Sequence, residues 1–459
     1  MKTPVPPPAP LGVLKRRLLM SEASPQRMLD LVTRPELVKD REYHPWEWFF
    51  RHEPPSGFTR EEWWTAVRWK REETARPLPL RLTSGTPLSF NLPDPLLELL
   101  EEITARTKGQ IELPEPVTNP TTRNRYLVSS LMEEAVTSSQ LEGASTSRVV
   151  AKRMLREGRT PTNRSERMIV NNYLAMLRII ELKDEPLSPE LIMEIHRRVT
   201  EGTLDDPSEA GRMQAPGEER VRIYGDIANE QVLHVPPPAE ELEERMSALC
   251  AFANSEKSAD TGYVPPLIRA VALHFMMGYD HYFADGNGRT SRAVFYWSML
   301  HQGFFLAEFL SLSRLFRAAP AKYARTFLLT EQDEGDLTHF LLEHARFLMR
   351  AIEELDAYLA LKTRSLTTLG RALRATDLNH RQIAVLESFM RDPGGCMTVA
   401  QHSATQGVVK QTARTDLQDL ESRGFLLSAR RGRSVTWFPV DDLVDRIEGG
   451  RGRGEGRRG

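Results

Sequence analysis

Apolar and amphipathic stretches dominate the central part of the chain and predict a mainly α-helical protein. The stretch Pro265–Asp280, PPLIRAVALHFMMGYD, has proline at a helix start and is then largely apolar, which predicts a buried helix. A second apolar run, Ala293–Leu300, predicts another helix that begins at about Arg289. Farther along, the pattern predicts a long helix over about Leu337–Lys362.

An amphipathic helix is predicted upstream, from about Arg123 to Gly143. Its apolar positions share one side: Leu127, Leu131, Ala135 and Val136. Ser138 and Glu142 are four residues apart and therefore lie on one face, and Gly143 is a natural C-terminal stop. Taken alone, this segment is an ordinary helix end.

Residues 211–238 carry the clearest β pattern of the central region. The β-prone runs Val221–Tyr224 and Gln231–Val235 flank Gly225–Glu230 and predict a hairpin. Without further context this is an ordinary surface hairpin.

The first part of the chain is rich in tryptophan mixed with basic residues. Five tryptophans lie close together in sequence: Trp46, Trp48, Trp63, Trp64 and Trp69. Such a mixture can stack on single-stranded nucleic acid, but we interpret it as the core of a small helical module with basic side chains at its edge. The prolines and leucines at 77–80 and the run to Asp94 predict a linker before a helix at Pro95–Thr107.

The C-terminal region predicts three helices followed by two strands. A first helix starts at Asn379, Thr398 caps a second, and Val408–Ser422 forms a third that Gly424 closes. The run FLLSARRGRSVTWFPV then predicts two strands around an Arg-Gly-Arg turn. This order resembles a winged helix-turn-helix, and the third helix is similar to its Thr-Ala-x-x-Asp-Leu-x-x-Leu pattern.

A winged helix-turn-helix presents the start of its third helix to the major groove of DNA. The residues at that position are Lys410, Gln411, Thr412 and Arg414. The wing would contact phosphate or a minor groove through Arg430, Arg431 and Arg433. Winged helices also serve as protein-interaction modules, so the partner is either DNA or protein.

Composition places these elements in a multidomain globular chain. With 459 residues, 40% hydrophobic and 27% charged, the length predicts about two to four domains. The net charge of −2 argues against a protein basic over its whole surface. The two cysteines, Cys250 and Cys396, predict a reducing compartment. Without a signal peptide or a run of ~18 to 20 apolar residues, we expect no membrane association and a cytoplasmic location.

Candidate chemistry concentrates in HYFADGNGRTSR, residues 281–292. Around Gly286, Asn287 and Gly288 the backbone can adopt positive φ and present successive N–H groups to an anion, and the following helix start adds its positive end. Arg289 and Arg292 share a face of that helix and suit consecutive phosphates.

A carboxylate and a histidine complete this stretch. Asp285 can hold a Mg2+ that keeps most of its waters, provided that phosphates supply other ligands. His281 is the one side chain of the stretch with an ordinary pKa near neutrality, which suits a general base. A histidine or a Gly-Asn-Gly turn alone is usually structural, but their joint order is far more specific.

The stretch resembles the Fic signature His-Pro-Phe-x-Asp/Glu-Gly-Asn-Gly-Arg-x-x-Arg. The resemblance implies transfer of AMP from ATP to a Ser, Thr or Tyr hydroxyl of a target protein. His281 would deprotonate the hydroxyl, Asp285 would bind Mg2+, and Phe283 would anchor the loop. The phosphates would lie on Gly286, Asn287 and Gly288, with Arg289 and Arg292 on the outer ones.

The resemblance also gives roles to the neighbouring segments. The hairpin resembles the family's flap, which holds a target segment by strand addition. Ser138, Glu142 and Gly143 look like the inhibitory helix, in which Glu142 would pair with Arg292 and leave the enzyme self-inhibited. One position departs from the signature: Tyr282 stands where proline is usual, and we expect this change to alter the mobility of the loop. His274, two helical turns before His281, is interpreted as a core residue rather than a metal ligand.

The implied fold is a Fic-type helical core with a small β-hairpin flap plus a winged helix-turn-helix. Its expected parts are a Trp-rich module at 1–84, helices at 85–200 that include the inhibitory helix 123–143, the core at 201–365, the winged domain at 376–442 and a disordered Gly/Arg tail at 443–459. The alternative is a DNA-binding transcriptional regulator whose core senses nucleotide. The direction of reaction, AMP addition or removal, and the formation of a homodimer stay open.

Overall fold

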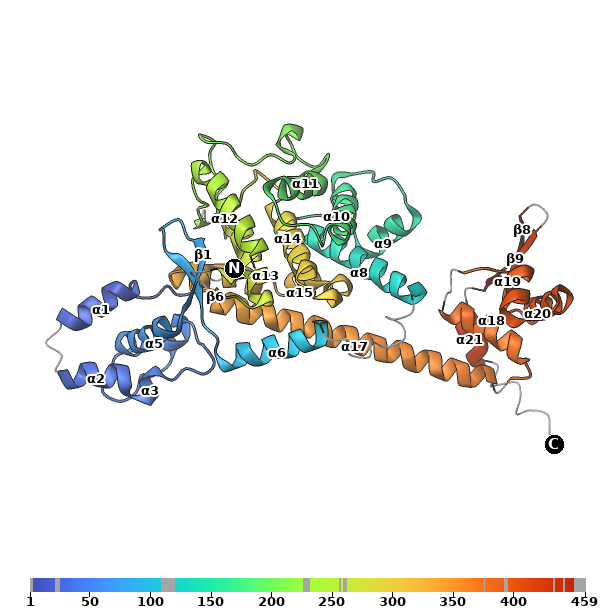
Figure 1. Ribbon diagram of the computed structural model, residues 1–459, viewed down its shortest axis with the longest axis horizontal. Helices are drawn as coiled ribbons and strands as arrows, with labels where there is room; N and C mark the ends of the chain where they lie inside the picture. The colour runs from blue at the N-terminus through green and yellow to red at the C-terminus, as the bar shows by residue number, and fades with distance from the viewer. Residues whose placement is uncertain are drawn as a thin grey trace. The chain divides into compact units, whose positions relative to one another are not determined.

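The computed structural model shows a mainly helical chain that divides into two compact units (Figure 1). It describes residues 3–20, 25–108, 120–225, 232–255, 257–258, 262–374, 376–391, 395–431, 434–440 and 442–449. The first unit contains residues 1–111 and 127–353, and the second contains residues 112–126 and 354–459. Within the described ranges, none of the helices combines the length and the apolar character needed to cross a bilayer.

The first unit begins with a small helical module. Its helices are α1 (Leu11–Met20), α2 (Pro25–Thr33), α3 (Pro35–Val38), α4 (Trp46–Arg51) and α5 (Arg60–Thr74). Thr59 starts α5 through a capping box with Glu62. Trp46 and Trp64 are buried with Phe49 in the module's core, while Trp48 and Trp63 pack at its edge. Two of the five tryptophans therefore form part of the module's core, which agrees with the interpretation of the cluster as the core of a small helical module.

Residues 77–94, expected to be a linker, instead contain a β-hairpin. Strand β1 (Arg76–Arg81) pairs antiparallel with β2 (Pro87–Phe90). Leucines and a phenylalanine at alternate positions point into the unit: Leu78, Leu80, Leu88 and Phe90 are all buried. The prolines concealed this alternation in the sequence, although an edge strand tolerates them. The expected boundary after residue 84 falls inside the turn of this hairpin.

The remaining elements of the first unit are a pair of central helices, α13 and α14, and the elements around them. They are α6 (Asp94–Lys108), most of α8 (Pro120–Leu141), α9 (Arg148–Glu157), α10 (Arg164–Glu181), α11 (Pro189–Thr200), η1 (Pro207–Glu209), β3 (Ile223–Tyr224), β4 (Val232–His234), η3 (Ala239–Glu241), α12 (Leu242–Asn254), β5 (Lys257–Ser258), β6 (Gly262–Tyr263), α13 (Pro266–Asp280), α14 (Asn287–His301), η4 (Phe305–Phe309), α15 (Leu312–Ala318), α16 (Pro320–Gln332) and the start of α17 (Thr338–Arg374).

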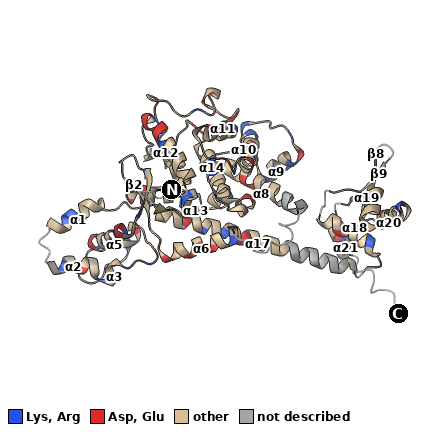
Figure 2. Cartoon of the chain, in the orientation of Figure 1, with Lys and Arg blue, Asp and Glu red and all other residues tan. Residues whose placement is uncertain are grey.

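Helices α13 and α14 form the centre of this unit and pack against each other. Both are buried along almost their whole length. Because α13 is apolar all round, it is stable only when other helices enclose it, here α12 and α14 among them. Acidic side chains gather at the start of α12, where Glu243 and Glu244 complement the positive end of the helix (Figure 2).

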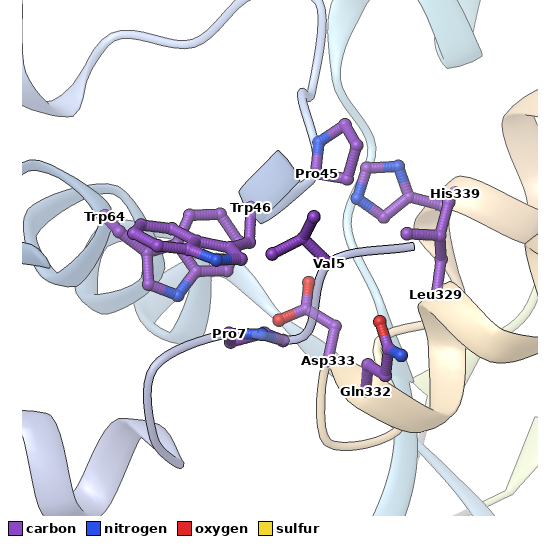
Figure 3. A pocket seen from close by; sticks show the side chains of 9 residues that line it. All are labelled: Val5, Pro7, Pro45, Trp46, Trp64, Leu329, Gln332, Asp333 and His339. Carbon is purple, nitrogen blue, oxygen red and sulfur yellow. The ribbon is translucent and has the colours of Figure 1, made fainter. Parts of the chain in front are cut away.

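A buried ionic cluster ties the Trp-rich module to the turn between α16 and α17. Arg68 of α5 lies 2.8 Å from the Asp333 carboxylate and 3.6 Å from that of Asp336. Beside it, Val5 and Pro7 line a cavity of about 10 Å³ together with Trp46, Trp64 and His339 (Figure 3). That volume matches one water molecule. The N-terminal module is therefore an integral part of the first unit.

The second unit contains the end of α17 and the predicted C-terminal elements. They are α18 (His380–Arg391), β7 (Met397–Thr398), α19 (Val399–Gln406), α20 (Lys410–Ser422), β8 (Leu426–Arg431), β9 (Ser434–Pro439) and α21 (Leu443–Gly449). The strands form one antiparallel sheet in the order β7-β9-β8. Leu386, Leu417 and Trp437 belong to the core. The three expected helices and the hairpin are present, with β7 in addition. Residues 443–449, expected to belong to a disordered tail, instead form α21, because Leu443 and Ile447 are buried in this core. The winged helix-turn-helix assignment itself stays a prediction.

We expect Arg68→Ala to lower the free energy of unfolding by about 3–5 kcal/mol, because it leaves buried carboxylates unpaired. Lys70→Ala is the matched control on the same helix, since its pair with Glu73 is exposed and contributes about 0.5 kcal/mol or less. Urea denaturation followed by tryptophan fluorescence measures both. Equal losses for the two variants would contradict a structural role for the buried cluster.

Candidate active site

His281 ends α13 in a left-handed conformation, with φ 51° and ψ 54°. Its Nδ1 lies 3.3 Å from the carbonyl oxygen of Gly278, so Nδ1 carries the proton and Nε2 keeps its lone pair. Burial lowers the pKa of His281 to about 4. The ring is therefore neutral near pH 7 and able to accept a proton at Nε2.

The residues after His281 are firmly anchored. Tyr282, at the position where the signature has proline, is fully buried and donates a hydrogen bond of 2.7 Å to Asp280. Asp280 also lies 3.1 Å from Arg245, while burial raises the pKa of its carboxyl to about 6. Phe283 is fully buried and stacks on the His196 ring at a centroid distance of 3.7 Å. The tyrosine thus supplies an anchor of its own.

The Gly-Asn-Gly turn differs from the expected geometry in one respect. Of its residues only Gly286 adopts positive φ, at 84°, and α14 begins at Asn287, two residues earlier than predicted. A Cβ at Gly286 would lie 2.5 Å from the Thr200 methyl group, so glycine is needed there. The backbone N–H groups expected to bind an anion therefore belong mainly to the first turn of a helix rather than to a series of left-handed residues.

The Asn287 side chain closes the loop instead of reaching outward. Its Oδ1 accepts a hydrogen bond of 3.0 Å from the backbone N–H of Phe283, and its Nδ2 donates one of 2.6 Å to the Phe283 carbonyl. The side chain is buried. What Asn287 offers to a phosphate is thus its backbone N–H at the helix start.

Glu142 brings a carboxylate to this helix start. Its Oε1 lies 2.8 Å from Arg292 Nη2, and a side chain at Gly288 would collide with the same carboxylate. Arg292 is further held by Ser138, whose Oγ accepts from Nε at 2.8 Å and whose carbonyl accepts from Nη2 at 2.9 Å. Gly143 ends the segment with φ 89°. Glu142 therefore places its negative charge beside the first turn of α14, where a bound anion is expected.

Arg289 and Asp285, the other residues predicted to bind phosphate and Mg2+, lie near the start of α14. Arg289 is buried, donates from Nη1 to the Val199 carbonyl at 2.6 Å, and has its pKa lowered by burial. Asp285 is exposed; its Oδ1 accepts from the Gly286 N–H at 2.5 Å and its Oδ2 lies 3.5 Å from Arg164. The structure thus brings Arg292, Glu142 and Gly288 together, while Arg289 is directed toward α11.

Two buried groups that the sequence did not single out support the site. His196 Nε2 lies 2.8 Å from the Asp285 carbonyl, and its Nδ1 accepts from the Gly211 N–H at 2.9 Å. Glu134, two turns before Glu142 on α8, accepts hydrogen bonds from the Tyr296 hydroxyl and the Ser313 N–H. Their partners lie far away in sequence, so no local pattern could have identified them.

His274 is a core residue, as predicted. It is fully buried, and its Nε2 lies 2.8 Å from the Tyr323 hydroxyl. Burial lowers its pKa well below the ordinary value. Across the part of the chain that the structure describes, no three His, Cys, Asp or Glu side chains are grouped to hold a metal ion.

The flap segment forms the predicted hairpin. Strands β3 and β4 pair antiparallel, with Ile223 opposite His234. Residues 226–231 lie outside the described residues. Tyr224 and Val232 are exposed on the strands.

The residues predicted to contact DNA lie at the start of α20. Lys410, Gln411 and Arg414 are exposed and Thr412 is half-buried. Arg433 and the side chains of Arg430 and Arg431 lie outside the described residues.

Residues 186–299, which include the flap, α13, the loop and most of α14, match the Fic/DOC family model. This part of the chain is a Fic domain. Glu142 lies before the Fic domain, so its place at the site rests on the contacts above.

The sequence similarity to curated relatives extends beyond the matched residues 186–299. The chain is 30% identical over 184 residues to Protein adenylyltransferase Fic of Nematostella vectensis, covering 39% of this chain and 36% of the relative. It is 30% identical over 191 residues to the Drosophila virilis protein of the same name, covering 41% and 32%. The chain thus spans about a third of the length of these relatives. A solved Fic family protein from Desulfovibrio desulfuricans is 18% identical, with a TM-score of 0.47 and coverage of 75% of this chain and 95% of that chain.

We expect Glu134→Ala to loosen α8 from the Fic domain and to lower the free energy of unfolding by about 3 kcal/mol, because buried donors lose their acceptor. Glu134→Gln keeps one acceptor oxygen and should lose about 1 kcal/mol. Urea denaturation gives the totals, and hydrogen exchange of residues 127–141 shows whether α8 is the segment affected. Unchanged exchange there in Glu134→Ala would contradict the anchoring role.

Proposed function

We propose that this protein is a protein adenylyltransferase that transfers AMP from ATP to a hydroxyl side chain of a target protein. The observation that carries the proposal is a neutral histidine, His281, one short loop before a helix start that already holds an anion against Arg292. The similarity to relatives named protein adenylyltransferase supports the same reaction.

The proposed chemistry assigns each step to a group on this loop. His281 Nε2 takes the proton of the target hydroxyl while its oxygen attacks the α-phosphate, and pyrophosphate leaves. The N–H groups at the first turn of α14, from Asn287 and Gly288, hold the phosphates, and Arg292 binds an outer phosphate. Arg289 adds positive charge beside them. The bond to the α-phosphate therefore forms within reach of the base.

Magnesium fits this site through a single protein carboxylate. Asp285 is exposed beside the helix start, and a Mg2+ with phosphate and water ligands needs few protein ligands. Bound there, the ion would neutralise charge on the phosphates.

The flap supplies the proposed contact with the target. Strands β3 and β4 lie on the segment that follows Gln214, and Tyr224 and Val232 are exposed on them, where they would face a target. An extended target segment that adds to this hairpin would place a Ser, Thr or Tyr hydroxyl by main-chain pairing, independent of much of its sequence.

We further propose that Glu142 keeps the enzyme self-inhibited. Its carboxylate holds Arg292 and covers Gly288, so both groups are engaged before ATP arrives. ATP would then lack the contacts that orient its outer phosphate. The same carboxylate can orient a water molecule for removal of AMP, so the reverse reaction stays within the proposal.

Glu142→Gly tests this function directly. We expect the transfer of label from α-32P-ATP with Mg2+ to rise on the order of 10- to 100-fold, since one charged contact on Arg292 is worth about 1.5–3 kcal/mol. Gln140→Gly is the matched control, because it weakens the same helix end without touching Arg292. His281→Ala in the Glu142→Gly background should abolish transfer. Equal rates in Glu142→Gly and Gln140→Gly would show that Glu142 is not inhibitory.

A second candidate function is a DNA-binding regulator whose Fic domain senses nucleotide. The observation that favours it is the exposed start of α20, where Lys410, Gln411 and Arg414 point away from the core. For this function we expect ATP to shift the affinity for DNA with no label transfer even in Glu142→Gly.

DNA binding itself is tested with a random-sequence duplex library in a fluorescence anisotropy titration. We expect Lys410→Ala and Arg414→Ala each to weaken binding and to reduce the salt dependence by about one counterion. Lys322→Ala, which removes an exposed cation of the first unit, should leave it unchanged. Equal affinities for all four proteins, or no binding at low salt, would contradict a DNA-binding role for α20.

A further inference from the structure

The C-terminal end of α13 carries carbonyl groups that its own helix cannot satisfy. The carbonyl of Gly278 faces the His281 ring. The next four carbonyls, from Tyr279 to Tyr282, all accept hydrogen bonds from the segment 214–234. That segment contains both flap strands. The end of α13, and with it His281, is therefore capped by the flap segment and not by solvent.

Arg220, three residues before β3, makes two of these contacts. Its Nη2 donates to the Asp280 carbonyl at 2.6 Å and to the His281 carbonyl at 2.8 Å. Its Nε donates to the Pro237 carbonyl at 2.7 Å, and its Nη1 donates to the Gln214 side chain. A planar guanidinium can bridge these four acceptors, whereas an ammonium group cannot hold them in the same geometry.

Two neighbours of Arg220 complete the cap. His234 of β4 has its Nε2 2.7 Å from the Tyr279 carbonyl and its Nδ1 2.8 Å from Glu331. The backbone N–H of Gln214 donates to the Tyr282 carbonyl at 2.9 Å. Both arms of the flap are thus bonded to the backbone on either side of His281.

This cap matters because His281 has an unfavourable backbone conformation. A left-handed conformation is unfavourable for a residue other than glycine, so the surrounding contacts must hold it. A cation at the negative end of α13 is also favourable. Burial is the main cause of the low pKa of His281; the nearby Arg220 guanidinium also lowers it, while Glu142 raises it.

We propose that Arg220 is a positioning residue that fixes the general base His281 and couples its placement to the flap. A target segment that adds to the flap would then be aligned with the base through one guanidinium. The inference rests on the proposed transferase function, in which His281 takes the proton of the target hydroxyl.

The activity test uses the full chain in the Glu142→Gly background, with label incorporation from α-32P-ATP at varied ATP. We expect Arg220→Met to reduce the maximal rate about 100-fold with little change in the half-saturating ATP concentration, because the base is misplaced. Arg220→Lys should reduce it about 10-fold, since it keeps the charge but not the bridge. Arg212→Gln is the matched control: Arg212 pairs with Glu209 and Glu218 in the same segment and does not contact α13.

A second readout follows the His281 ring itself by NMR titration of 13C-histidine-labelled protein, with its signal identified by its loss in His281→Asn. Removal of the positive charge in Arg220→Met should raise the pKa of His281 above about 4, whereas Arg220→Lys and Arg212→Gln should keep it low. A structural effect elsewhere in the protein would not change the pKa of His281.

The proposal is overturned if Arg220→Lys retains the parent rate, or if Arg220→Met loses rate with an unchanged His281 titration. If Arg220→Met fails to fold, the rate of label transfer by Arg220→Lys tests the proposal instead. If the Glu142→Gly parent transfers no label, the proposed transferase function is wrong. An unchanged pKa of His281 in Arg220→Met would separately show that Arg220 does not act on His281.

Discussion

Arg292 lies buried at the positive end of α14, and a cation in that position requires an anionic partner. In this structure Glu142 is that partner. The surrounding architecture serves this one contact: Ser138 holds the guanidinium from α8, Glu134 holds α8, and Gly288 leaves room for the carboxylate. A phosphate of ATP would meet the same donors. In the proposed function, inhibition and substrate binding would therefore be two uses of one anion position.

The loop between α13 and α14 joins helix ends of opposite polarity. The carbonyl end of α13 meets Arg220 and His234, and the N–H end of α14 meets Glu142. The carbonyl end of α13 is thus bonded to the flap segment, while a carboxylate that follows α8 lies beside the N–H end of α14. His281 lies between these two ends. In the proposed mechanism, a change in either segment would reach His281 through a few hydrogen bonds rather than through a rearrangement of the core.

Much of this site could be predicted from sequence because its chemistry is local. The order of His281, Phe283, Gly286 and Arg292 lies in one continuous stretch, and Ser138 with Glu142 needs only helical spacing. The sequence predicts the start of α14 two residues late, because Asn287 is helical rather than part of the turn. It does not identify His196, Glu134 and Arg220, because their partners are backbone atoms or side chains distant in sequence. It predicts a linker where β1 and β2 form a hairpin, because proline alternates with the buried leucines.

We propose that the Glu142 carboxylate and a phosphate of ATP compete for one position. A crystal structure of the Glu142→Gly variant with ATP and Mg2+ is a direct test of this competition. We expect a phosphate oxygen within hydrogen-bond distance of both the Arg292 guanidinium and the N–H of Gly288. Phosphates bound elsewhere, with Arg292 still held by Ser138 and free of them, would contradict it.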